Sequence, residues 1–227
     1  MVKKLFSIIS ILLVSASLFA ARSVTYKEDL TNCIQFYGYL NEYCTLNITG
    51  LNQSGNVGMP FSIMDSSVSY NASDIRLGRE IASWSLSTNA SEVKIIIKPE
   101  PLICEDDETK FFNYYLTFRY EYADAKTGKD LTGYIVAHSD ATSPVVINKT
   151  TTATASDFNS VTNNYVELSN KASDDSTLPI ISINKDVRFM LDKAYSSTEF
   201  DNYPDGYYYA KVKIQVEGKW WKKALSF

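Results

Sequence analysis

The chain has 227 residues, of which 22 are basic and 26 are acidic, for a formal net charge of −4. This acidic balance argues against nucleic acid as a partner, because binding to nucleic acid depends on neutralising phosphates with lysine and arginine. The 16 tyrosines and 11 phenylalanines, together with only 9 glycines, favour β-strands with polar connections over a helical bundle.

The N-terminal residues have the layout of a secretory signal peptide. Lys3 and Lys4 precede a short apolar run, and Ala20 and Ala21 end it with small side chains. A membrane-spanning helix needs about 20 apolar residues, so an uncleaved anchor is the weaker alternative. We predict a bacterial-type signal peptide over residues 1–21 and an exported chain, periplasmic, cell-surface or secreted, with no later membrane span. Without the two lysines, 20 basic residues face 26 acidic ones, a net charge of −6.

The chain contains three cysteines, and in an exported protein two of them are expected to pair. Cys33 and Cys44 bracket a short segment that could form a clipped hairpin or loop, and we predict a disulfide between them. The alternative pairs Cys44 with Cys104, which would tie an early strand to a later loop. One thiol remains unpaired in either case.

Segments typical of short β-strands follow one another along the chain. They lie at 44–50, 81–89, 92–102, 111–122, 134–139, 144–148, 164–168, 179–184, 186–191 and 207–217. The longest of them, 111–122, alternates with a period of two, which predicts one buried and one exposed face. The residues expected inside are Phe112, Tyr114, Leu116, Phe118 and Tyr120, and those expected outside are Phe111, Asn113, Thr117 and Arg119.

Many short strands with turn signals about every ten residues predict an all-β fold, an antiparallel β-sandwich. A polar stretch rich in Ser, Thr and Asn begins near Asn148. We therefore predict a β-sandwich module over 22–142, and over 143–227 either a second β module or the continuation of the same sandwich. Two tandem modules are the alternative that a faint repeat would indicate, in which "VKI" at 93–95 recurs at 212–214.

Residues that could carry catalysis or bind metal are sparse. His138 is the only histidine, and the adjacent Ser139 and Asp140 cannot both flank it as a catalytic triad requires. One histidine and three scattered cysteines give no zinc cluster, and the acidic loops lack calcium-loop spacing. We therefore predict no catalytic residues, no metal and no cofactor.

The last predicted strand carries three consecutive tyrosines. Its alternation places Tyr208 inside and directs Tyr207 and Tyr209 outward beside lysines. Trp220 and Trp221 follow after the next turn. We predict that Tyr207, Tyr209, Trp220 and Trp221 form a binding platform, because tyrosine and tryptophan combine a large apolar area with a polar group. The alternative is that another part of the chain covers these side chains.

An exported, strand-rich chain that ends in "GYYYAKVKIQVEG" resembles bacterial pilins and other immunoglobulin-like surface modules. The resemblance implies an immunoglobulin-like or pilin-like sandwich. Pilins that assemble by strand exchange carry an alternating N-terminal extension, and "ARSVTYKEDL" alternates poorly, which argues against fibre assembly.

These patterns predict an exported, non-enzymatic protein that acts by binding, or as a structural or adhesive component, at the cell envelope or surface. Its expected partner is a protein or a carbohydrate. The alternative is a secreted carbohydrate-active hydrolase on a β scaffold, since the two carboxylates of such an enzyme can come from distant parts of a chain.

Overall fold

The computed structural model of the protein describes residues 42–50, 61–141, 143–158, 163–170 and 180–220. The predicted signal peptide, Cys33 and Trp221 lie outside these residues. The chain divides into two units, and the fold described below belongs to the unit Tyr43–Trp221.

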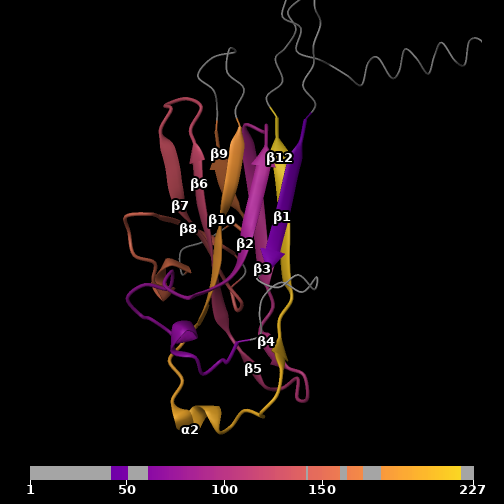
Figure 1. Cartoon of the computed structure of the whole chain (residues 1–227), viewed down its shortest axis with the longest axis vertical. Coiled ribbons are helices and arrows are strands. Elements are labelled where there is room, and N and C mark those ends of the chain that lie inside the picture. Colours follow the sequence, from indigo (N-terminus) through magenta and orange to yellow (C-terminus); the bar gives the residue numbers. More distant parts are fainter. Residues whose placement is uncertain (1–41, 51–60, 142, 159–162, 171–179, 221–227) are drawn as a thin grey trace, which may run out of the picture. The chain divides into compact units, whose positions relative to one another are not determined.

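The unit is built from antiparallel β-strands, which confirms the all-β prediction (Figure 1). The largest sheet has six strands, in the order β1 (Cys44–Gly50), β2 (Arg79–Thr88), β10 (Ile181–Leu191), β6 (Tyr114–Ala123), β7 (Asp130–His138) and β8 (Val145–Asn148). A second sheet has the order β12 (Val212–Lys219), β3 (Glu92–Pro99) and β9 (Val166–Ser169). A third, small sheet has the order β11 (Tyr208–Tyr209), β4 (Leu102–Cys104) and β5 (Phe111–Phe112).

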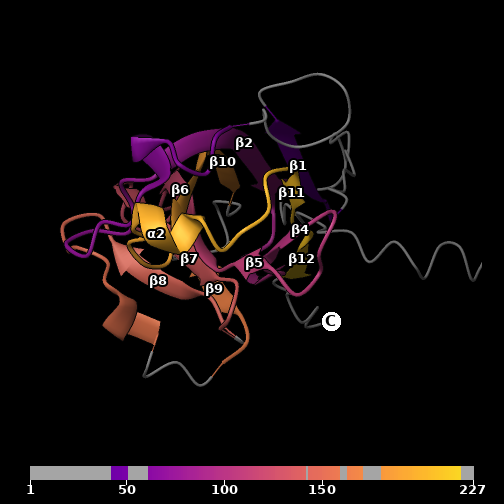
Figure 2. The same ribbon diagram turned by 90° about the horizontal axis from the view of Figure 1, so that it is seen from below.

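Helical structure in the described residues is limited to three short turns: η2 (Ser66–Val68), η3 (Ala155–Phe158) and α2 (Ser197–Phe200). The small sheet strands β4 and β5 lie at the same end of the unit as α2, at the bottom of Figure 1. Figure 2 looks at this end directly.

Strands from the C-terminal part of the chain pair with strands from the N-terminal part. β10 lies between β2 and β6, β12 pairs with β3, and β11 pairs with β4. The residues after 143 thus complete sheets that begin before it.

One large core lies between side chains of the six-stranded sheet and side chains of β3 and β9. Trp84 on β2 illustrates the packing: its ring meets that of Phe118 edge-on at 5.7 Å, and its Nε1 donates a hydrogen bond to the carbonyl of Arg119 at 2.7 Å. Aromatic pairs with this geometry add to the stability that comes from burial alone.

The alternation predicted for 111–122 is confirmed on the inner face and at Phe111, and it is wrong at Thr117. All five residues expected inside are buried, and Phe111 is exposed. Thr117, however, is buried, and so is Tyr115 beside it. The reason is a second, smaller core on the opposite face of the sheet, formed with Ile75 and Met190.

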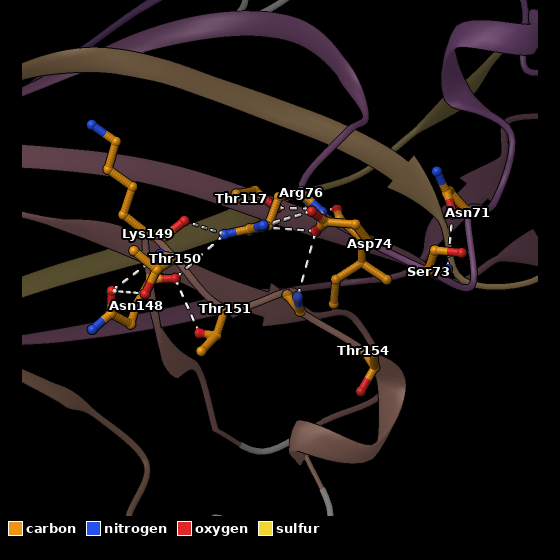
Figure 3. A network of polar contacts seen from close by, with 12 residues as sticks. Asn71, Ser73, Asp74, Arg76, Thr117, Asn148, Lys149, Thr150, Thr151 and Thr154 are labelled. Carbon is orange, nitrogen blue, oxygen red and sulfur yellow. Dashed lines mark hydrogen bonds and ion pairs between the residues drawn. The ribbon is translucent and has the colours of Figure 1, made fainter.

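Two loops cover that opposite face, and Arg76 ties them together (Figure 3). Its guanidinium donates to both carboxylate oxygens of Asp74, with Nη2–Oδ2 at 2.6 Å, and to the backbone carbonyls of Asn148 and Lys149. Its Cζ also lies 4.9 Å from the ring centre of Tyr134. Burial raises the pKa of Asp74, but the hydrogen bonds and charge of Arg76 outweigh it and hold that pKa below its ordinary value.

No disulfide joins the two cysteines of the described residues: Cys44 is exposed and Cys104 is buried. The alternative Cys44–Cys104 pairing is therefore wrong. The pairing of Cys44 with Cys33 stays a prediction, because Cys33 lies outside the described residues.

Candidate binding surface and adjoining pocket

Tyr209 is part of a row of apolar side chains across one face of the small sheet. In the strand register Tyr209 is opposite Ile103, and Ile103 is opposite Phe111. Residues that are directly opposite in a sheet share a face, so the three side chains stand side by side. Tyr207 lies two residues before Tyr209 and therefore on the same face. Its carbonyl accepts a hydrogen bond from the amide of Glu105 at 2.8 Å, which holds it beside β4. We call Tyr207, Tyr209, Ile103 and Phe111 the aromatic row.

The three aromatic side chains of the row are exposed in the described structure, and Ile103 is half-buried. Tyr207 is 76% exposed, Tyr209 is 48% exposed and Phe111 is 45% exposed. No described part of the chain therefore covers the two tyrosines, and the side-chain directions expected from the alternation are the ones observed.

The Tyr208 side chain lies on the opposite face of β11 and packs against the main core. Its ring lies 5.2 Å from that of Phe112, and its hydroxyl donates to the carbonyl of Pro204 at 2.9 Å. Burial, with a contribution from Cys104, raises the pKa of the Tyr208 hydroxyl to about 12. The three consecutive tyrosines thus have two roles, one inward anchor between two outward side chains.

Trp220 does not join the aromatic row. It follows the far end of β12, where its ring packs half-buried against the core and its Nε1 donates to Asn89 Oδ1 at 2.8 Å. It lies eleven positions after Tyr209, roughly 36 Å along the chain at the usual rise of a strand. Trp221, the fourth residue of the predicted platform, lies outside the described residues.

A polar pocket of about 540 Å³ adjoins the aromatic row at Phe111, which lines both. Its other lining residues include Asn113, Asp192, Lys193, Glu199 and Asn202. They come from the strand ends after β5 and β10 and from the segment around α2, so the pocket lies at the end of the unit that Figure 2 shows.

The two tyrosines of the pocket wall, Tyr195 and Tyr203, pack against neighbouring side chains. Tyr203 stacks on Phe112 with ring centres 4.2 Å apart, and Lys193 Nζ lies 4.5 Å from the ring centre of Tyr195. Burial, followed by the charge of Asp192, raises the pKa of the Tyr195 hydroxyl. These ring contacts form one wall of the pocket, and the Tyr195 hydroxyl stays protonated at neutral pH.

Glu199 has a structural role in this wall. Its Oε2 accepts hydrogen bonds from the amide of Ser196 at 2.8 Å and from the Ser196 hydroxyl at 3.0 Å, a capping box that begins α2. Lys193 Nζ lies 3.3 Å from its Oε1. The hydrogen bonds from Ser196 and Lys193 lower the pKa of Glu199, so it stays ionised.

His138 and Asp192 meet at the edge of the pocket, with Nε2 and Oδ2 3.5 Å apart. His138 stacks on Tyr115 at 4.6 Å, and neither His138 Nε2 nor Asp192 Oδ1 has a hydrogen-bond partner within the described ranges. Ser139 donates its hydroxyl proton to Asn113 instead, at 2.9 Å. Sequence reasoning missed Asp192 because it lies 54 positions after His138 and no local motif links them.

No three His, Cys, Asp or Glu side chains within the described residues are grouped so that they could hold a metal ion. In the same part of the chain, no helix has the length and apolar character needed to cross a membrane. Comparison with protein-family models, with curated proteins and with solved structures finds no significant match to this chain.

Proposed function

We propose that this protein is an exported, non-enzymatic binding protein of the cell envelope or surface, and that the aromatic row contacts its partner. The observation that carries this proposal is the row itself: three aromatic side chains and Ile103 side by side on one exposed sheet face. Exposed aromatic side chains that stand together are typical of interaction sites, because a few such anchors supply most of the binding energy.

The fold we propose for this role is an antiparallel β-sandwich of immunoglobulin-like or pilin-like type. Support comes from the shared core, to which the six-stranded sheet and the sheet of β12, β3 and β9 both contribute. Such a scaffold holds the small sheet, and with it the aromatic row, on rigid strands. Export rests on the signal-peptide pattern of residues 1–21.

A secreted hydrolase is the competing function. The carboxylates of the pocket do not suit it. A glycosidase needs one carboxylic acid that stays protonated to act as general acid, which requires a raised pKa. Glu199 has a lowered pKa and is engaged in a helix cap. The pocket therefore has one carboxylate, Asp192, available for chemistry where such an enzyme needs two.

Substitution of the row tests the proposal. The variant Tyr207→Ser/Tyr209→Ser/Phe111→Ser should keep its fold, because exposed substitutions change stability by no more than about 0.5 kcal/mol each. Its binding to envelope material of the source cell, or to a panel of surface polysaccharides, should fall at least about 10-fold relative to the wild type.

A matched control replaces three apolar residues that are exposed elsewhere, in the variant Tyr43→Ser/Leu131→Ser/Val146→Ser. This control should bind like the wild type. Equal binding by the row variant and the wild type would refute the proposal, as would a loss of binding in both triple variants.

A further inference from the structure

We propose that the pocket beside Phe111 binds a neutral sugar, as a free saccharide or as the end of a surface polysaccharide. This inference rests on the proposed binding function and gives its ligand a chemical class. The pocket volume of about 540 Å³ lies in the range that small-molecule sites occupy.

The charges of the pocket favour a neutral ligand. Lys110 and Lys193 line it together with Asp192 and Glu199, so the formal charges cancel. The ion pair between Lys193 and Glu199 further reduces the field that either would exert on a ligand. A strongly anionic or cationic ligand would meet one repulsive side chain for every attractive one.

The hydrogen-bonding groups of the pocket fit a ligand with many hydroxyls. Asn113 accepts a hydrogen bond from Ser139 through Oδ1, which leaves its amide N–H groups to donate. Asp192 can only accept: its Oδ2 lies 3.5 Å from His138, and its Oδ1 has no partner in the described structure. The Asp192 side chain lines the pocket, so a sugar hydroxyl can donate a hydrogen bond to its carboxylate.

Phe111 supplies the apolar contact that a sugar ring needs. Its half-exposed ring stands where the aromatic row meets the pocket. A saccharide in the pocket can place the C–H face of a ring against Phe111, and a longer chain would continue over Ile103 and Tyr209. The pocket and the row would then form one extended site.

Titration of the full mature protein with glucose, galactose, mannose and N-acetylglucosamine, followed by nuclear magnetic resonance, tests this inference. At least one of them should cause saturable shifts at residues 109–113 and 192–203. The ligand efficiency of small polar molecules places the Kd in the millimolar range. A trisaccharide that binds about 10-fold more tightly than its monosaccharide would identify a polysaccharide end as the source, and equal affinities would identify a free sugar.

The variant Asp192→Asn should weaken sugar binding about 10-fold or more, because it removes the charged acceptor. Asp186→Asn is the matched control, since its side chain is as buried (18% exposed against 19%) and lies on β10, the strand that Asp192 directly follows, but outside the pocket. Both variants are compared with the wild type in thermal unfolding, so that a loss of fold is seen directly.

Three results would overturn the inference: no saturable shift with any of the four sugars, unchanged affinity in Asp192→Asn, or tighter binding of glucosamine or glucuronic acid than of glucose. None of them affects the aromatic row, whose role is decided by the serine variants and envelope binding. If sugar binds in the pocket but the row substitutions leave envelope binding unchanged, the proposed function is refuted and the sugar inference stands.

Discussion

Phe118 packs edge-on against Trp84 in the main core and is 2% exposed. Truncation of a buried phenylalanine to alanine loses its apolar burial and leaves a cavity, so Phe118→Ala should lower the free energy of unfolding by about 3–5 kcal/mol. Urea denaturation followed by tryptophan fluorescence measures this change. A loss below about 1 kcal/mol would mean that this face of β6 is not buried.

Arg76 should stabilise the protein through a buried ion pair. Arg76→Ala leaves the Asp74 carboxylate mostly buried without its partner, which should cost about 3 kcal/mol at pH 7. Arg188→Ala is the control, because Arg188 is more exposed and its pair with Asp186 should contribute no more than about 1 kcal/mol.

The same pair should make the stability dependent on pH. The folded pKa of Asp74 lies below its ordinary value of 3.8, so its contribution is fully present above that value. It is lost as the pH falls through the lowered, folded pKa. In Arg76→Ala, burial without the partner raises the pKa of Asp74 above 3.8. The stability difference between the wild type and Arg76→Ala should therefore be constant near neutral pH and shrink in acid, as first the variant's Asp74 and then the wild-type Asp74 becomes protonated, as measured by thermal unfolding. A difference that persists unchanged in strong acid would contradict an ionic origin.

At the level of single strands, β11 gives a direct test of side-chain direction. Tyr208 is the inward residue, so Tyr208→Ala should cost about 2–3 kcal/mol, somewhat less than a fully buried aromatic side chain. Tyr209→Ala on the opposite face should change the stability by no more than about 0.5 kcal/mol. Equal losses in the two variants, or a larger loss in Tyr209→Ala, would reverse the assignment of faces.

Strand alternation was sufficient to predict which residues of β6 enter the main core and which way Tyr207 and Tyr209 point, because both depend on the local period of two. It could not predict the burial of Thr117, since loops distant in the sequence cover that side of the sheet. For the same reason Phe111 and Asp192 were not recognised as part of the site. Their positions depend on the pairing of β5 with β4 and on the end of β10, neither of which leaves a local signal.

For the unit as a whole, the position of β10 between β2 and β6 makes the N-terminal part dependent on the C-terminal part. A fragment of residues 22–142 lacks β8 to β12 and would expose the apolar faces of β2, β3 and β6. We expect it to be unfolded or aggregated by circular dichroism and size-exclusion chromatography, whereas residues 22–227 fold. Cooperative unfolding of the 22–142 fragment would instead support two tandem modules.

Photo-crosslinking in the source cell tests the binding role of the aromatic row most directly. A photoreactive phenylalanine analogue replaces Tyr209 in the row, and in a second strain it replaces Val146, an exposed residue of β8. Irradiation should give a discrete cross-linked product, with a protein or with a polysaccharide, from position 209 and none from position 146. A product from position 146 with none from position 209 would contradict the proposal that this protein binds its partner through the aromatic row.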